Sequence, residues 1–178
     1  MHTSYLPSFS WYQEWIKRDS ELILSTDEKY QRQTSRNRTF INTSNGILRL
    51  SVPVIRPNGQ NSLTEEIIVD DTKKWRTEHL RAIQNAYANS PYFDFYYFEL
   101  ERILLSDEKS LVEINKKFIE FTKEHLKLEA LKSTSKQLDN SILECPYQPV
   151  FFFDKKDWKS VSIIDGLFNL GPIIRDFF

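Results

Sequence analysis

The chain has 178 residues, a length that favours one domain and suffices to bury a core without a metal or disulfide. Hydrophobic residues make up 40% and charged residues 28%, which excludes disorder along the whole length. The net charge of −1 excludes a global field that would hold nucleic acid or an anionic membrane. No stretch is long and apolar enough to cross a bilayer. We therefore expect one soluble, cytoplasmic domain over residues 1–178, with no membrane span and no bound nucleic acid.

Hydrophobic periodicity and turn residues predict a mixture of short strands and helices. Together they indicate an α/β fold in the broad sense, in which a small mixed sheet with a β-hairpin is covered by three or four helices. In chain order, the predicted elements are a helix Ser10–Lys17, a strand Glu21–Ser25, a hairpin within Arg36–Val54, a strand Ile67–Val69, a helix capped by Asp71 or Thr72 and running to Ala88, a helix Phe93–Leu105, a helix Lys109–Leu131 capped by Ser106 or Asp107, a strand Val150–Phe153, and a last helix opened by Ser162 and closed by Gly171-Pro172.

The hairpin is the clearest of these predictions. Asn45-Gly46 is a strong two-residue turn, because both positions tolerate positive φ. A turn at these residues places Ile41 opposite Leu50. The alternation of apolar and polar residues after the turn predicts that one face of the hairpin is buried.

A basic run from Lys29 to Arg38 holds four cations and no acid. The predicted pairing puts Arg36 and Arg38 on the outer face of the hairpin, together with Arg49. Three guanidinium groups on one face can bind a phosphate or a carboxylate bidentately. The alternative is a solvated face with surface ion pairs, which charge runs commonly form.

Two uncharged polar residues are further candidates. The pairing points Asn37 toward the core, where a buried amide must find partners; it either orients a ligand or ties down a bend in the strand. His79 lies on the apolar face of a predicted helix, and it is either a general base or a core histidine with one satisfied nitrogen. With His2 and His125 it forms no usual zinc pattern, so we expect no metal.

Four segments of the chain resemble the WbqC-like family, in the family's order and over nearly the whole length. They are Tyr5-Leu6-Pro7; the block with Glu28, Tyr30, Gln33, Arg36, Asn37 and Arg38; the block with Trp75, Arg76, His79, Ala86, Tyr87, Ser90, Pro91, Tyr92 and Phe93; and Ser162-Ile163-Ile164-Asp165 followed by Leu167-Phe168-Asn169 and Gly171-Pro172.

The resemblance implies a transferase of bacterial surface-polysaccharide (O-antigen or capsule) biosynthesis. Such an enzyme would move an aminoacyl or acyl group to an amino sugar on a nucleotide or a lipid, without a cofactor. His79 would be the catalytic base. The predicted substrate-binding residues are Tyr30, Gln33, Arg36, Asn37, Arg38, Arg49, Trp75, Arg76, Tyr87 and Asn169.

The alternative is a non-catalytic binding or scaffold protein of the same machinery. The aromatic run from Tyr92 to Phe98 is too dense for one helix face, so part of it either forms an exposed edge or docks a partner protein. The position of the arginines separates the two hypotheses. A closed pocket shared by the arginines, His79 and Asn169 favours the enzyme, whereas arginines in bulk solvent and a His79 buried against Trp75 favour the scaffold.

Overall fold

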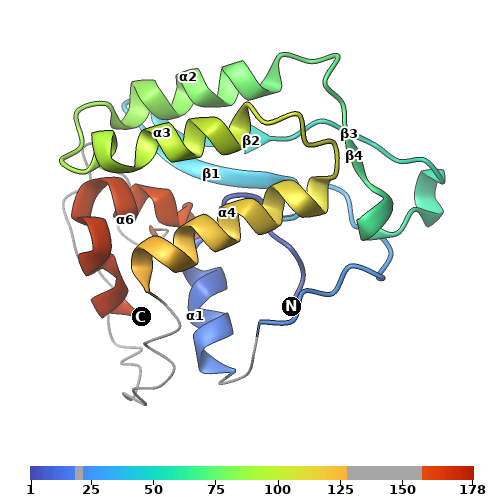
Figure 1. Cartoon of the computed structure of the whole chain (residues 1–178), viewed down its shortest axis with the longest axis horizontal. Helices are drawn as coiled ribbons and strands as arrows, with labels where there is room; N and C mark the ends of the chain where they lie inside the picture. The colour runs from blue at the N-terminus through green and yellow to red at the C-terminus, as the bar shows by residue number, and fades with distance from the viewer. Residues whose placement is uncertain (19–21, 128–157) are drawn as a thin grey trace.

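Two small antiparallel sheets and a layer of helices build the computed structural model (Figure 1), which describes residues 1–18, 22–127 and 158–178. The mixed fold class is confirmed, but the single predicted sheet is two. The elements are α1 Phe9–Lys17, β1 Arg38–Thr43, β2 Gly46–Ser51, β3 Val54–Ile55, β4 Ile68–Val69, α2 Trp75–Tyr87, α3 Phe93–Leu104, α4 Leu111–Leu126 and α6 Ile163–Leu170, with short 3₁₀ helices at Gly59–Asn61, Thr64–Glu66, Trp158–Ser160 and Gly171–Phe177.

The hairpin of β1 and β2 forms as predicted, but the predicted register is wrong by two residues. Thr43 pairs with Gly46, and Ile41 therefore lies opposite Leu48. The Thr43 hydroxyl donates to the Gly46 carbonyl oxygen at 2.7 Å, which places Ser44 and Asn45 in the turn. Because the shift is an even number of residues, every side chain within the strands keeps its predicted face.

The other strand predictions have mixed outcomes. The strand at Ile67–Val69 is confirmed as β4, which pairs with β3 in a second sheet. The strand predicted at Glu21–Ser25 is wrong over its described part, where Ser25 makes an isolated bridge to His2. The strand predicted at Val150–Phe153 lies outside the described residues.

Three of the predicted helix starts can be compared with the caps. Ser162 caps α6 as predicted, since its hydroxyl accepts from the Ile164 amide. Ser110, not Ser106 or Asp107, caps α4. The cap of α2 is Lys74, which gives no side-chain hydrogen bond; Asp71 is unavailable because its carboxylate accepts from side chains further along the chain.

The core lies between the inner face of the hairpin, the helix pair α2 and α4, and the N-terminal segment (Figure 1). Tyr5, Ile41 and Phe118 are fully buried there, and the rings of Tyr5 and Phe118 meet edge to face at 5.5 Å. Helices α1 and α6 lie below the hairpin in the view of Figure 1. In the described ranges, none of the helices has the length and apolarity to span a membrane.

We expect Gly171→Ala to destabilise the fold by about 2–3 kcal/mol. Gly171 ends α6 with φ 61°, and a Cβ there would stand 2.6 Å from Cε1 of Tyr92. Gly59→Ala is the matched control, because Gly59 has φ 58° but no atom within 4 Å of such a Cβ. Urea unfolding should give about 1 kcal/mol for the control, from backbone strain alone. Equal losses in the two variants would contradict the Tyr92 contact.

Candidate functional site

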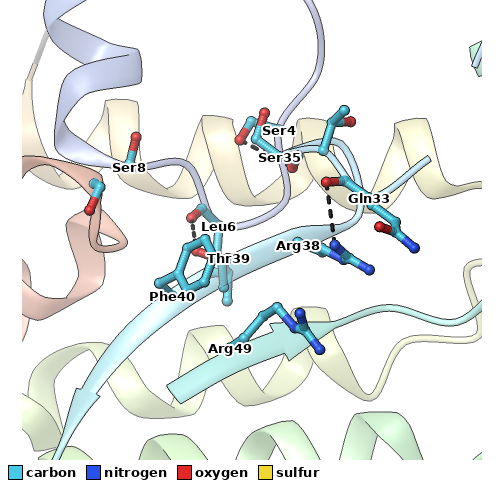
Figure 2. A pocket seen from close by; sticks show the side chains of 11 residues that line it. Ser4, Leu6, Ser8, Gln33, Ser35, Arg38, Thr39, Phe40 and Arg49 are labelled. Atoms are coloured by element: carbon cyan, nitrogen blue, oxygen red, sulfur yellow. Dashed lines mark hydrogen bonds between the residues drawn. The ribbon is translucent and has the colours of Figure 1, made fainter. Parts of the chain in front are cut away.

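A pocket of about 190 Å³ lies between the outer face of the hairpin and the N-terminal segment; we call it the hairpin pocket (Figure 2). Nine of the eleven described residues that line it have polar side chains, and none of the eleven is acidic. The lining residues are Ser4, Leu6, Ser8, Gln33, Thr34, Ser35, Arg38, Thr39, Phe40, Arg49 and Ser160.

Two arginines supply the charge of the hairpin pocket. Arg38 is on β1 and Arg49 is on β2, two pairs further along the ladder, so both lie on the outer face. Figure 2 shows the two side chains extending on the same side of the hairpin. Arg38 donates to the Gln33 carbonyl oxygen at 3.4 Å, and its Nε has no partner. Within the part of the chain that the structure describes, neither arginine pairs with a carboxylate, so both charges are available to an anion.

An aromatic ring lies beside these charges. Phe40 pairs across the hairpin with Arg49, and its side chain is 40% exposed. The neighbouring Thr39 hydroxyl donates to the Leu6 carbonyl oxygen at 2.8 Å, which fixes the N-terminal segment as one wall. The hairpin pocket thus offers a flat apolar surface next to two guanidinium groups.

Backbone strain is concentrated at this pocket. Three non-glycine residues in the described ranges have positive φ, and two of them, Leu6 at 42° and Gln33 at 63°, line the hairpin pocket. The third, Lys127, ends α4, where a left-handed residue is ordinary. A left-handed conformation costs a non-glycine residue about 1–2 kcal/mol. Such strain gathers at functional sites, where the surrounding structure holds it.

A titratable group also reaches the pocket wall. His2 Nε2 lies 2.9 Å from Oγ of Ser35, which lines the pocket. Burial and the nearby Arg36 charge lower the pKa of His2 below its usual value. The ring is therefore neutral near pH 7 and can accept a proton.

Arg36, predicted to share the outer face, lies elsewhere. The predicted register carried the ladder past Arg38, but β1 begins at that residue. The Arg36 side chain is buried and forms an ion pair with Glu28. Its backbone carbonyl oxygen accepts from Nδ2 of Asn115 at 2.8 Å. Arg36 thus joins the segment before β1 to α4, and its charge is already neutralised.

Asn37 makes the contacts expected of the second of its predicted alternatives, the tie at a bend, while its Oδ1 has no partner in the described ranges. Its Nδ2 donates to the Val52 carbonyl oxygen at 3.0 Å, and its own carbonyl oxygen accepts from the Val52 amide at 2.8 Å. Asn37 thus ties the segment before β1 to the segment after β2, at the point where the regular ladder ends.

Tyr30 is affected by the charges of several arginines around this end of the hairpin. Burial raises the pKa of Tyr30 to about 12, while the charges of Arg36, Arg38, Arg56 and Arg32 act to lower it. Arg32 is exposed and Arg56 is half-buried. Arg32 and Arg56 thus add positive charge near this end of the hairpin, whereas the charge of Arg36 is offset by Glu28.

His79 is 5% exposed and packs edge to face on Trp75, with ring centroids 5.3 Å apart. Its Nδ1 lies 2.8 Å from the Tyr5 hydroxyl. Desolvation lowers the pKa of His79 to about 4, partly offset by a hydrogen bond to the Ser51 backbone. The neutral ring therefore donates to Ser51 and accepts from Tyr5, and it joins α2 to β2 and to the N-terminal segment.

The two residues that open α2 have structural partners. The indole of Trp75 donates to Asp71 at 3.1 Å. The Arg76 guanidinium lies over the Trp75 ring, binds the same carboxylate, and donates to the carbonyl oxygens of Leu104 and Glu108. Arg76 thus holds the end of α3 and the loop before α4 against the start of α2.

Tyr87 and Asn169 belong to a buried network around α6. The Tyr87 hydroxyl donates to Oδ1 of Asp165 at 2.8 Å, and Nδ2 of Asn42 donates to the same oxygen at 3.0 Å. Asn169 donates to the Asp165 carbonyl oxygen at 2.7 Å. Neither Tyr87 nor Asn169 is among the residues that line the hairpin pocket.

The structure brings three of the predicted site residues together, and these are Gln33, Arg38 and Arg49. His79 is buried against Trp75 and lies apart from them, which is the arrangement expected of the scaffold. The arginines share a defined pocket, which is closer to the arrangement expected of the enzyme. Sequence reasoning missed the contribution of Ser4, Leu6 and Ser35, and the signal that could have revealed it is the polar, serine-rich N-terminal segment.

A helix-covered hairpin with a basic pocket on its outer face defines the general class of this protein. A family model described as the WbqC-like protein family matches residues 3–148. The chain therefore belongs to the WbqC-like family. No curated protein and no solved structure matches it.

Proposed function

We propose that the chain is a transferase of surface-polysaccharide biosynthesis. It places an aminoacyl or acyl group on an amino sugar that is attached to a phosphate-bearing carrier, either a nucleotide or a lipid. The observation that carries the proposal is the pair Arg38 and Arg49, whose charges line the hairpin pocket with no acidic residue in its described wall. Membership of the WbqC-like family is consistent with a role in polysaccharide assembly.

The transfer requires a base as well as an anion site. The sugar amine attacks the carbonyl carbon of an activated ester or thioester, the new C–N bond forms, and the leaving group departs with its electron pair. The amine then loses a proton, which Ser35 relays to Nε2 of His2 across their 2.9 Å contact. His79 acts in this scheme as a positioning residue, because both of its ring nitrogens bind the protein.

The test is a complementation experiment with mass spectrometry of the surface polysaccharide. A strain without the gene should lose the mass of one aminoacyl or acyl group per modified sugar, and the wild-type gene should restore it. The double variant Arg38→Gln/Arg49→Gln should not restore it, whereas Arg81→Gln, at an exposed arginine of α2, should. We expect His2→Gln to lower the modified fraction at least tenfold. Full restoration by the double variant would refute the proposal.

A scaffold function is the second candidate, and one observation favours it. Phe95 and Phe98 on α3 are 76% and 77% exposed, although Phe93 and Tyr96 of the same run are buried. Two neighbouring exposed phenylalanines are unusual on a surface that contacts only water. If Phe95→Ser/Phe98→Ser abolishes modification in cells but the Arg38→Gln/Arg49→Gln variant does not, the scaffold function replaces the transferase.

A further inference from the structure

We propose that the carrier is a nucleoside diphosphate, held with its phosphates on Arg38 and Arg49 and its base against Phe40. This inference rests on the proposed function and narrows its substrate from any phosphate-bearing carrier to a nucleotide sugar. Three features of the hairpin pocket support it, and each excludes a different competing ligand.

The spacing of the charges favours two linked phosphates over one small anion. Arg38 pairs with Ser51, and Arg49 pairs with Phe40, so the two arginines are diagonal neighbours on one face. Diagonal neighbours have Cβ atoms roughly 7 Å apart. Each planar guanidinium binds one phosphate through two parallel N–H bonds. Two guanidinium groups at this spacing can bind the two phosphates of a diphosphate, whereas a lone carboxylate would bind only one of them.

The surrounding field favours a ligand with more than one negative charge. Arg32 and Arg56 act on Tyr30 together with Arg38, and the described lining holds no acidic residue. The chain as a whole has a net charge of −1, so this is a local concentration of positive charge. A focused field of this kind attracts polyanions and raises their association rate.

The ring of Phe40 favours a nucleotide over a lipid. Its face is partly open beside Arg49, and stacking of a base on an aromatic ring contributes about 1–3 kcal/mol. A polyprenyl chain would need a continuous apolar groove. Apart from Phe40, the apolar residue in the described lining is Leu6, which is 1% exposed. The other described lining residues have polar side chains, with five hydroxyl residues suited to ribose and sugar hydroxyls besides Thr39: Ser4, Ser8, Thr34, Ser35 and Ser160.

Calorimetric titration of the full chain tests the inference with three kinds of ligand. These are four nucleoside diphosphates (UDP, GDP, CDP and dTDP), inorganic pyrophosphate, and farnesyl diphosphate as a short isoprenoid diphosphate. We expect one or more of the nucleotides to bind at least tenfold more tightly than pyrophosphate and farnesyl diphosphate. Arg38→Gln and Arg49→Gln should each weaken nucleotide binding tenfold or more, and Arg81→Gln should leave it unchanged.

A second variant separates base recognition from phosphate recognition. Phe40→Leu should weaken nucleotide binding about fivefold to a hundredfold and leave pyrophosphate binding unchanged. Equal affinity for nucleotide and pyrophosphate, or an unchanged affinity in Phe40→Leu, would overturn the role of the base. Tighter binding of farnesyl diphosphate, or no binding of any nucleotide, would overturn the nucleotide carrier altogether. Either result leaves the proposed transferase standing if the complementation experiment still shows loss of the modification.

Discussion

Replacing His79 with alanine should lower the free energy of unfolding by about 3 kcal/mol at pH 7. The substitution removes a buried ring and leaves both the Tyr5 hydroxyl and the Ser51 carbonyl oxygen without a partner. Tyr5→Phe removes one of the same hydrogen bonds and keeps the packing, so its cost should be nearer 1–2 kcal/mol. Chemical denaturation at pH 7 measures both.

The pH dependence identifies the neutral imidazole as the stabilising form. The pKa of His79 falls to about 4 in the folded chain, whereas an unfolded chain has the usual value near 6.5. Between these values the unfolded chain binds a proton that the folded chain does not, so stability is present above pH 6.5 and is lost as the pH falls toward 4. The loss amounts to about 3 kcal/mol.

The difference in stability between wild type and His79→Ala should therefore shrink as the pH falls through this window. A difference that stays constant from pH 7 to pH 4 would contradict a buried neutral ring.

The loss of His79 should also affect the hairpin pocket, because its partner Tyr5 directly precedes the strained Leu6 of the pocket wall. We expect the His79→Ala variant to bind anions more weakly while its Arg38 and Arg49 remain intact.

The outer face of the hairpin could be predicted from the sequence because strand alternation is a local property. The period of two puts Arg38 and Arg49 on one face, and an error of two residues in the register does not change this. In the observed register, the Thr43 hydroxyl donates to the Gly46 carbonyl oxygen. Gly46 has φ 119°, but Asn45 is not among the residues with positive φ, so the turn expected at Asn45-Gly46, which needs positive φ at both positions, does not form.

The partners of the buried polar residues could not be predicted, because they lie far apart in the chain. Arg36 is neutralised by Glu28, which lies in an irregular segment. The partner of His79 is Tyr5, 74 residues away. Helix periodicity placed His79 on a buried face, but it contains no information on which residue satisfies the ring. The wall formed by the N-terminal segment was missed for the same reason.

The second large effect should appear at the network that holds α6 on the hairpin. Asp165→Ala leaves the Tyr87 hydroxyl and the Asn42 amide group without their shared acceptor, and all three residues are buried. We expect a loss of about 3–4 kcal/mol in unfolding free energy, and about 2 kcal/mol for Tyr87→Phe. Asp107→Ala, at an exposed position of the loop before α4, should change stability by no more than about 0.5 kcal/mol.

A double-mutant cycle on Tyr87 and Asp165 distinguishes a network from two separate contacts. The coupling energy should be about 1–3 kcal/mol, whereas strictly additive losses would contradict the shared acceptor.

The position of this network explains the shape of the site. Asn42 lies on the same outer face of β1 as Phe40, and the Ser162 amide donates to the Phe40 carbonyl oxygen at 2.8 Å. Helix α6 thus covers the end of the face near the turn, and the hairpin pocket occupies the end that α6 leaves open.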